Sequence, residues 1–257
     1  MLAIKLLLTP MLVGVMSLVG RRWGPAVSGW FVGLPLTSGP ITLYLALDQG
    51  TAFAARAAQG TLLGLISVAS FCLAYSWLSR RAGWLGSLLA SWCVFFASTF
   101  VLERLSVPLV IAFAAVITFL TIVLKLFPTI HGQSSVMPSP RWEVLLRMVT
   151  ATAFVLALTA VSGLLGPQLS GLLTPFPIYA TILGAFTHHF QGAAAASRLL
   201  RGVVLGTFTF ACFFLIVAAT IEREGIVIAF GTAALASLLL HGCSLWFLRR
   251  YFDLPSG

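Results

Sequence analysis

Charged residues are scarce in this sequence, and acidic ones most of all. Only 8% of the 257 residues are charged, with 6 Asp or Glu against 15 Lys or Arg. A soluble domain carries about 25% charged residues, so this composition excludes a soluble domain of useful size. The basic residues stand singly or in pairs at the ends of apolar runs, where a membrane protein places them. We therefore infer no nucleic-acid partner from the net charge of +9.

Motifs of enzymes, ATP-driven pumps and metal sites are also missing. The chain has no HExxH, no GxSxG, no Walker glycine loop and no paired intramembrane aspartates. We expect no enzyme, no cofactor and no metal site, with an intramembrane enzyme using a histidine kept as a weaker alternative. The cysteines lack CxxC or Cys/His spacing and are interpreted as packing residues inside apolar runs: Cys72, Cys93, Cys212 and Cys243.

Long apolar runs make up most of the chain, in which 60% of the residues are hydrophobic. Because about 20 apolar residues cross a bilayer as a helix, we predict an all-α polytopic membrane protein with about nine transmembrane helices. The crossings are expected near residues 2–19, 26–46, 57–78, 83–101, 107–127, 145–164, 168–188, 199–219 and 226–246.

The basic residues also predict an orientation. Nine crossings place the termini on opposite sides. With the N-terminus outside and the C-terminus in the cytoplasm, the external basic residues are only Lys5, Arg56, Arg104 and Arg223. The positive-inside bias favours this arrangement. We predict a multi-pass protein of a bacterial inner membrane.

The sequence repeats itself once. Residues 24–73 match residues 166–215 without a gap. Residue 24 aligns with residue 166, which is a shift of 142 positions. In an apolar chain, apolar residues often match by chance, whereas polar, Gly, Pro and Arg residues seldom match by chance at one fixed shift. The matches include Pro35 with Pro177, Gln49-Gly50 with Gln191-Gly192, and Arg56 with Arg198.

One period of the repeat contains five crossings, which is an odd number. Each unit of four helices is therefore predicted to be inserted upside down relative to the other. We expect two inverted four-helix repeats, residues 1–104 and 143–257, joined by a linker helix and polar loop in 105–142. In agreement, Arg21 and Arg22 match the uncharged Gly163 and Leu164, as expected if matched ends face opposite sides.

The second crossing of each repeat contains helix breakers, in GLPLTSGP (33–40) and LTPFPIYAT (173–181). Proline removes a backbone donor and frees a carbonyl, and such backbone at mid-depth must be buried in protein or line a wet cavity. Inverted repeats with interrupted helices are typical of secondary transporters. We predict that substrate is bound here by Pro35, Thr37, Ser38, Pro177, Tyr179 and Thr181. The alternative is a pair of proline kinks that serve packing alone.

A shared pattern follows each predicted break, QGTAFAAR (49–56) and QGAAAASR (191–198). The glycine is expected to end the broken helix, with the arginine in the first turn of the next. A guanidinium suits a carboxylate, phosphate or sulfate, so Gln49, Arg56, Gln191 and Arg198 complete the predicted substrate site. The alternative for the arginines is snorkelling to the membrane surface.

Few titratable groups are available for proton coupling. Asp48 is a candidate as a partner of Arg56, and His188 and His189 are candidates because histidine titrates near neutral pH. Ordinary interfacial hydrogen bonds are the alternative for this histidine pair. His241 is a third, weaker candidate, and Glu143 is interpreted as a cytoplasmic residue.

Two GxxxG pairs predict close helix packing, Gly60 with Gly64 and Gly202 with Gly206. They leave open whether the chain is a monomer or a homo-oligomer.

Together these features favour a small bacterial secondary transporter that works by alternating access. The expected ligand is a small anion or a lipid with an anionic head group, which would make the protein flippase-like. The other hypothesis is a non-transporting membrane subunit or assembly factor of a larger complex.

Overall fold

The described part of the chain consists of helices and short connections. The computed structural model describes the backbone of residues 2–105, 107–128, 142–173 and 176–251, and the side chains of 7–105, 107–128, 142–157 and 176–244. Within those residues there are nine helices and no strand: α1 Leu2–Trp23, α2 Pro25–Val32, α3 Ser38–Gln49, α4 Thr51–Leu78, α5 Trp84–Leu102, α6 Leu109–Leu126, α7 Trp142–Leu173, α8 Ile178–Gln191 and α9 Ala193–Tyr251.

Both predicted interruptions are present. Residues 33–37 separate α2 from α3, and α7 ends at Leu173 before α8 begins at Ile178. Phe176 and Pro177 are not helical, whereas Thr174 and Pro175 lie outside the described residues. The cause is local, because a residue that precedes proline avoids the helical region and proline cannot donate to the helical ladder.

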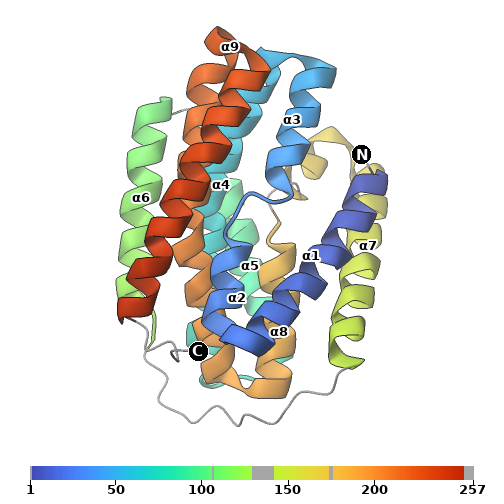
Figure 1. The fold of residues 1–257 in the computed structure, drawn as a ribbon. Helices are drawn as coiled ribbons and strands as arrows, with labels where there is room; N and C mark the ends of the chain where they lie inside the picture. Colours follow the sequence, from blue (N-terminus) through green and yellow to red (C-terminus); the bar gives the residue numbers. More distant parts are fainter. Residues whose placement is uncertain (1, 106, 129–141, 174–175, 252–257) are drawn as a thin grey trace.

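The last two predicted crossings form one helix with a sharp bend. Gly225 inside α9 has a φ of 80° and a ψ of 173°, which is not a helical conformation. Figure 1 shows the two arms of α9 lying side by side, joined by this bend at the top of the molecule. The bend lies between the predicted crossings at 199–219 and 226–246.

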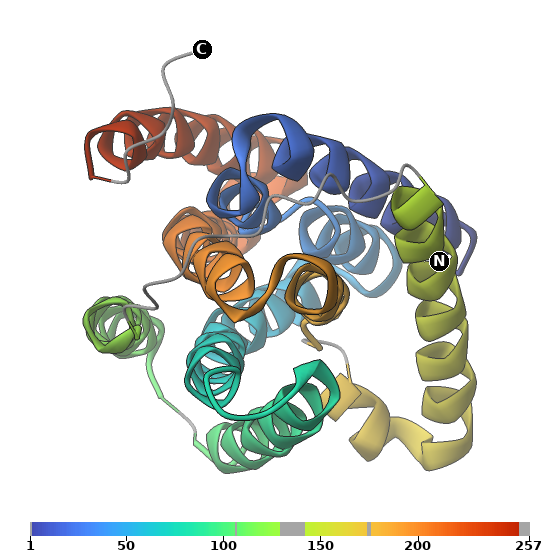
Figure 2. The same ribbon diagram turned by 90° about the horizontal axis from the view of Figure 1, so that it is seen from below.

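The chain passes repeatedly between the two ends of an elongated bundle (Figure 1). The α3–α4 turn lies at the top, and the α1–α2 and α8–α9 turns lie at the bottom. Viewed from below in Figure 2, α6 stands at the edge of the bundle, while α1 and α7 line another side. In agreement, α6 packs on α4 and α9, and α1 packs along α7.

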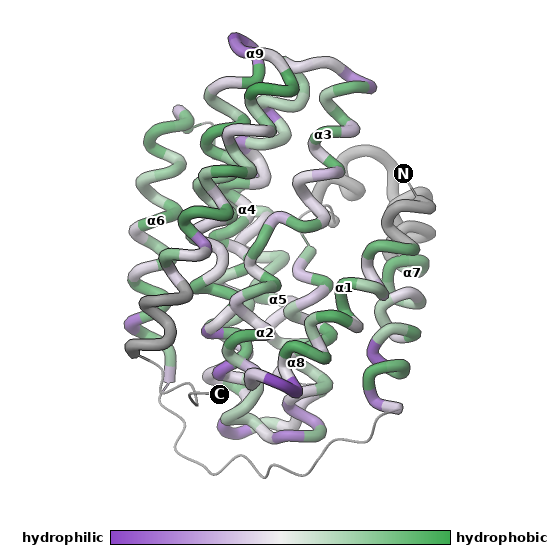
Figure 3. The backbone as a smooth tube through the Cα atoms, in the orientation of Figure 1, coloured by the Kyte–Doolittle hydropathy of each residue, from purple (hydrophilic) through white to green (hydrophobic). Residues whose placement is uncertain are grey.

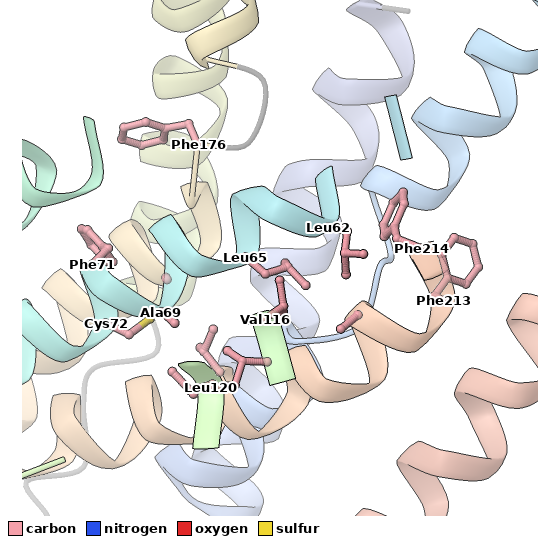
Figure 4. Close-up of a cluster of buried hydrophobic side chains, with 14 of the residues drawn as sticks. Leu62, Leu65, Ala69, Phe71, Cys72, Val116, Leu120, Phe176, Phe213 and Phe214 are labelled. Atoms are coloured by element: carbon pink, nitrogen blue, oxygen red, sulfur yellow. The ribbon is translucent and has the colours of Figure 1, made fainter. Parts of the chain in front are cut away.

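The core lies where α4 and α9 pack against each other. Figure 4 shows Leu62, Leu65 and Phe71 of α4 beside Val116 and Leu120 of α6. Phe213 and Phe214 of α9 complete this cluster. Burial of large apolar side chains from three helices holds the centre of the bundle together.

The outer surface of the bundle is largely apolar along its length. Figure 3 shows hydrophilic residues gathered at the two ends and hydrophobic residues between them. Four described helices are long and apolar enough to cross a membrane: Thr51–Leu78, Trp84–Leu102, Leu109–Leu126 and Ala193–Ser244. On α6, Val110 is 75% exposed and Ile111 56%. Such a surface is compatible with a membrane protein.

Candidate functional site

Several carbonyls at the first break, residues 33–37, accept hydrogen bonds from nearby backbone N–H groups. In a continuous helix the residue at position 35 would donate to the Phe31 carbonyl, but proline has no N–H to donate. This carbonyl accepts the N–H of Leu34 instead, at 3.1 Å. The Pro35 carbonyl accepts from Gly39 at 2.9 Å, and the Thr37 carbonyl accepts from Ile41 at 3.1 Å. The proline therefore does not leave its former partner unpaired, contrary to the expectation of a freed carbonyl.

The backbone at the second break, which precedes α8, also forms local hydrogen bonds. The Phe176 carbonyl accepts the N–H of Ile178 at 2.8 Å, and the Pro177 carbonyl accepts that of Thr181 at 2.9 Å. Pro177 is the residue that precedes the first turn of α8. Because proline has no N–H to bond to a preceding helical turn, α8 begins as a new helix after Pro177.

Side chains of the two breaks meet inside the molecule. The Tyr179 hydroxyl interacts electrostatically with the side chains of Thr37, in the first break, and Thr9, on α1. The hydroxyl oxygen is buried but forms no hydrogen bond of regular geometry among the described residues. Three hydroxyls from three separate segments thus converge at one place, and one of them is left without a firm partner.

Thr181, two residues further along α8, faces a different neighbour. Two residues in a helix are about 200° apart around its axis. The Thr181 side chain is buried, and its hydroxyl accepts the indole N–H of Trp92 on α5 at 3.2 Å. Thr181 is therefore already engaged in helix packing. The half-buried Ser38 begins α3, and its carbonyl accepts the Thr42 hydroxyl at 2.9 Å.

The two QG…R segments end up at opposite ends of the bundle. Gly50 ends α3 and Gly192 ends α8, as predicted, with φ values of 87° and 88°. Figure 1 shows the first of these turns at the top and the second at the bottom. Because α4 and α9 start directly after these glycines, Arg56 and Arg198 lie in the second turn of their helices rather than the first.

The predicted site residues therefore fall into three groups. The breaks meet in the interior, whereas Gln49 and Arg56 are exposed at one end of the bundle. Gln191 and Arg198 are half-buried at the other end. The structure does not bring these three groups into one pocket.

The candidates for proton coupling have ordinary surroundings. Asp48 is exposed, and no ion pair joins it to Arg56 among the described residues. His188 Nδ1 lies 3.2 Å from the hydroxyl of Tyr75, which is buried in the core. His189 is exposed and its ring meets the Trp84 ring edge-on, with centroids 5.9 Å apart.

His241 is more enclosed than the other two histidines. Its ring stacks on Trp30 of α2 with centroids 3.6 Å apart, and its Nδ1 lies 3.3 Å from the Thr209 hydroxyl. The side chain is 4% exposed, and Nε2 has no hydrogen-bond partner among the described residues. Trp30 in turn donates its indole N–H to Ser244 at 2.8 Å. This cluster ties α2 to the second arm of α9.

A buried ion cluster is the feature that sequence reasoning missed. Glu143 and Arg147, one turn apart on α7, form a hydrogen-bonded ion pair. Arg21 of α1 approaches the other oxygen of the Glu143 carboxylate at 3.5 Å. The side chains of Glu143 and Arg147 are only 1% and 6% exposed. The i, i+4 spacing was the available signal, but only the packing of α1 and α8 over α7 makes the pair buried.

A pocket adjoins this ion cluster. It is a small space of about 10 Å³, enough for about one water molecule, is partly open to solvent, and lies between α1, α2, α7, α8 and α9. Arg21 and Arg147 line it together with Ser17, Ser28, Thr187 and Gln191. Gln191 is the one predicted site residue that takes part in its lining. We refer to this space below as the basic pocket.

Two lining groups of the basic pocket have unused donors. Thr187 is 1% exposed, and neither its hydroxyl nor Nε of Arg147 has a hydrogen-bond partner among the described residues. By contrast, Ser17 and Ser28 donate to backbone carbonyls at 2.7 Å. Buried donors without a partner are costly to the folded protein.

The described residues contain no group of three or more His, Cys, Asp or Glu that could hold a metal ion. Comparison with protein-family models, with curated proteins and with solved structures gives no match for this chain.

Proposed function

We propose that the chain is a small secondary transporter of a bacterial inner membrane. Two four-helix units, inserted in opposite orientations, would rock against each other and expose a central site to one side at a time. The ligand would be a small anion or a lipid with an anionic head group. The N-terminus would lie outside and the C-terminus in the cytoplasm.

The positions of the helix ends support two related units. A shift of 142 residues carries Gly50, at the end of α3, onto Gly192, at the end of α8. The two glycines have nearly the same conformation, with ψ values of 168° and 172°. The same shift carries Gly83, which precedes α5, onto the bend at Gly225. Related sequence and related helix boundaries are what a duplication predicts.

The placement of matched turns supports opposite orientations. The α3–α4 turn and its counterpart, the α8–α9 turn, lie at opposite ends of the bundle in Figure 1. Units that shared one orientation would have both turns at the same end. In addition, Figure 3 shows that hydrophilic residues collect at both ends, as the two faces of a membrane would require.

The observation that carries the proposal is the convergence of the two breaks. Thr37 and Tyr179 come from opposite repeats and are brought next to each other with Thr9. The Tyr179 hydroxyl is buried without a regular partner. A buried polar group without a partner is costly to the folded protein, and relative movement of the two units would change this contact.

Transport by the purified protein in liposomes tests the proposal. We expect wild-type protein to move at least one member of a panel of small anions and fluorescent anionic lipids. Tyr179→Phe should slow that movement by about tenfold, since one hydrogen bond made during the cycle is lost. The matched control is Tyr44→Phe, because Tyr44 is exposed on α3. No movement of any probe, or equal rates for the two variants, would contradict the proposal.

The choice of an anion has its own test. Substituting Arg56→Gln or Arg198→Gln should raise the anion concentration needed for half-maximal transport, because each removes a positive charge from one end of the bundle. If both variants move the transported probe as wild type does, the ligand is not recognised by these arginines.

A non-transporting membrane subunit is the second candidate. It is favoured by the closed hydrogen bonding of the first break, where Phe31, Pro35 and Thr37 all use their carbonyls locally. This candidate predicts a partner that stays bound through purification in mild detergent. It also predicts that no anion or lipid shifts the melting temperature.

A further inference from the structure

We propose that the outer surface where the end of α6 meets the end of α4 binds the head group of an anionic phospholipid. The lipid would stay on the outside of the bundle and within its own leaflet. The inference goes beyond the proposed function, because it requires a bilayer but no movement of a ligand across it. We call this the α4–α6 surface and define it by six residues: Trp77, Arg80, Arg81, Ile122, Lys125 and Leu126.

Two hydrogen bonds hold α6 along α4, one at each end of α6. The Gln59 side chain of α4 donates to the Val107 carbonyl at 2.6 Å, just before α6 begins. The Trp77 indole N–H, near the end of α4, donates to the Leu126 carbonyl at 3.0 Å. Leu126 is the last residue of α6. The ends of the two helices are therefore fixed next to each other at the bottom of Figure 1, where both helices end.

Basic side chains gather around the contact between Trp77 and Leu126. The guanidinium carbon of Arg80 lies 5.1 Å from the centre of the Trp77 ring, which is a cation–π distance. Arg81 follows Arg80, and Lys125 precedes Leu126 in the last turn of α6. All three basic residues are exposed, and none forms an ion pair with a carboxylate of the described residues. Two helices thus present three positive charges on one surface.

The exposed acidic residues lie towards the other end of the bundle. They occur where α3 and α5 end and at the bend of α9, towards the top of Figure 1: Asp48, Glu103, Glu222 and Glu224. Among the described residues, the acid at the bottom is Glu143, which is buried and paired with Arg147. No exposed carboxylate of the described residues therefore offsets the charge of the α4–α6 surface. Charge complementarity favours an anionic head group over a zwitterionic one, as basic clusters at the cytoplasmic membrane surface do.

The same surface offers an apolar wall for the acyl chains of a lipid. Ile122 and Leu126 are exposed and lie one turn apart on the same side of α6. Trp77 is also exposed, and tryptophan typically lies at the level of the head groups. A phospholipid would use the basic residues and the apolar wall together, whereas a free phosphate would use only the basic residues. We therefore assign a lipid to this surface.

Native mass spectrometry of the full-length protein tests the proposal. The protein is released from nanodiscs made of equal amounts of phosphatidylcholine and phosphatidylglycerol, and the lipids that stay bound are identified. We expect phosphatidylglycerol to be enriched among the bound lipids relative to the bilayer. Bound lipids with the composition of the bilayer would overturn the inference.

Two double variants locate the binding. Arg80→Gln/Lys125→Gln removes one charge from each helix of the α4–α6 surface and should weaken retention of phosphatidylglycerol about tenfold. The matched control, Arg104→Gln/Arg223→Gln, removes the same net charge from the other end of the bundle. Arg104 also lies over an aromatic ring, 4.0 Å from the centre of Phe100. The control should retain phosphatidylglycerol as wild type does. An equal loss in both double variants would show a response to net charge alone and would overturn the site.

Failure of this inference is separable from failure of the proposed function. Retention of phosphatidylglycerol that depends on Arg80 and Lys125, without transport of any probe in liposomes, would support the α4–α6 surface and contradict the transporter. Transport by a protein that retains the two lipids equally would do the reverse.

Discussion

Single residues decide whether the chain can turn at the ends of its broken helices. Gly50 and Gly192 combine φ values of 87° and 88° with ψ values of 168° and 172°. This region of backbone conformation is essentially restricted to glycine. Both turns would therefore be strained by any side chain, although an added Cβ would meet no atom within 4 Å at either position.

We predict that Gly50→Ala and Gly192→Ala each lower the free energy of unfolding by about 1–3 kcal/mol. Gly83→Ala is the matched control, because Gly83 also precedes a helix but has a φ of −65°, and its Cβ would likewise be unobstructed. Unfolding in mixed micelles with increasing denaturing detergent measures all three. Equal stability of the three variants would show that conformation at these turns is unimportant.

The Glu143–Arg147 pair makes a second prediction at the scale of single residues. Arg147→Leu should cost about 3–5 kcal/mol, because it leaves a buried carboxylate without its hydrogen-bonded partner. The double variant Glu143→Leu/Arg147→Leu should recover most of that loss, since Arg21 is 26% exposed and can be hydrated. The same unfolding assay measures both. A double variant less stable than the single one would mean that the pair itself stabilises the fold.

Pairs of helices depend on close backbone contact at a few positions. On α9, a Cβ added to Gly206 would lie 2.3 Å from the Trp30 carbonyl oxygen of α2. A Cβ added to Gly33 would lie 2.3 Å from the Cα of Gly206. The predicted Gly202–Gly206 pair is therefore used inside one chain, against a glycine-containing face of α2. Gly60, which matches Gly202 in the other repeat, has no neighbour within 4 Å of an added Cβ.

A Cβ added to Gly202 would lie 2.2 Å from the Ala26 carbonyl oxygen of α2. We expect Gly202→Ala to separate α2 from α9 and to destabilise the protein by about 1–3 kcal/mol, as overpacking does. Gly60→Ala, at the matched position of the other repeat, should leave the melting temperature nearly unchanged. Comparison of the two melting temperatures in one detergent checks this. Equal loss at both positions would indicate that Gly60 packs against something else, such as a second copy of the chain.

Helix positions could be predicted from the sequence, because apolar runs, prolines and glycines act locally. Among the described residues, helix occupies most of each predicted run, and Gly50 and Gly192 end α3 and α8 as expected. The interruptions at Pro35 and Pro177 were also found.

Contacts between distant helices could not be predicted in the same way. Glu143 is buried where α1 and α8 pack on α7, and no local pattern in the sequence records that packing. For the same reason, no pattern in the sequence indicates that Thr181 bonds Trp92 or that Thr187 lines a pocket.

The whole molecule is proposed to consist of two related units with opposite orientations in the membrane. Gln49 and Gln191 are one matched pair of positions, and Arg81 and Arg223 are another. Gln49, Arg81 and Arg223 are exposed, and Gln191 is half-buried. The α3–α4 turn, which follows Gln49, and the bend of α9, which follows Arg223, lie at the top of Figure 1. Their matched counterparts, the α8–α9 turn and the α4–α5 turn, lie at the bottom.

The most direct test is single-cysteine labelling in intact cells, after replacement of the four native cysteines. An impermeant maleimide should label Gln49→Cys and Arg223→Cys from outside, and should reach Gln191→Cys and Arg81→Cys only after the membrane is permeabilised. Labelling of both members of a matched pair from the same side would contradict opposite orientation and remove the basis for alternating access.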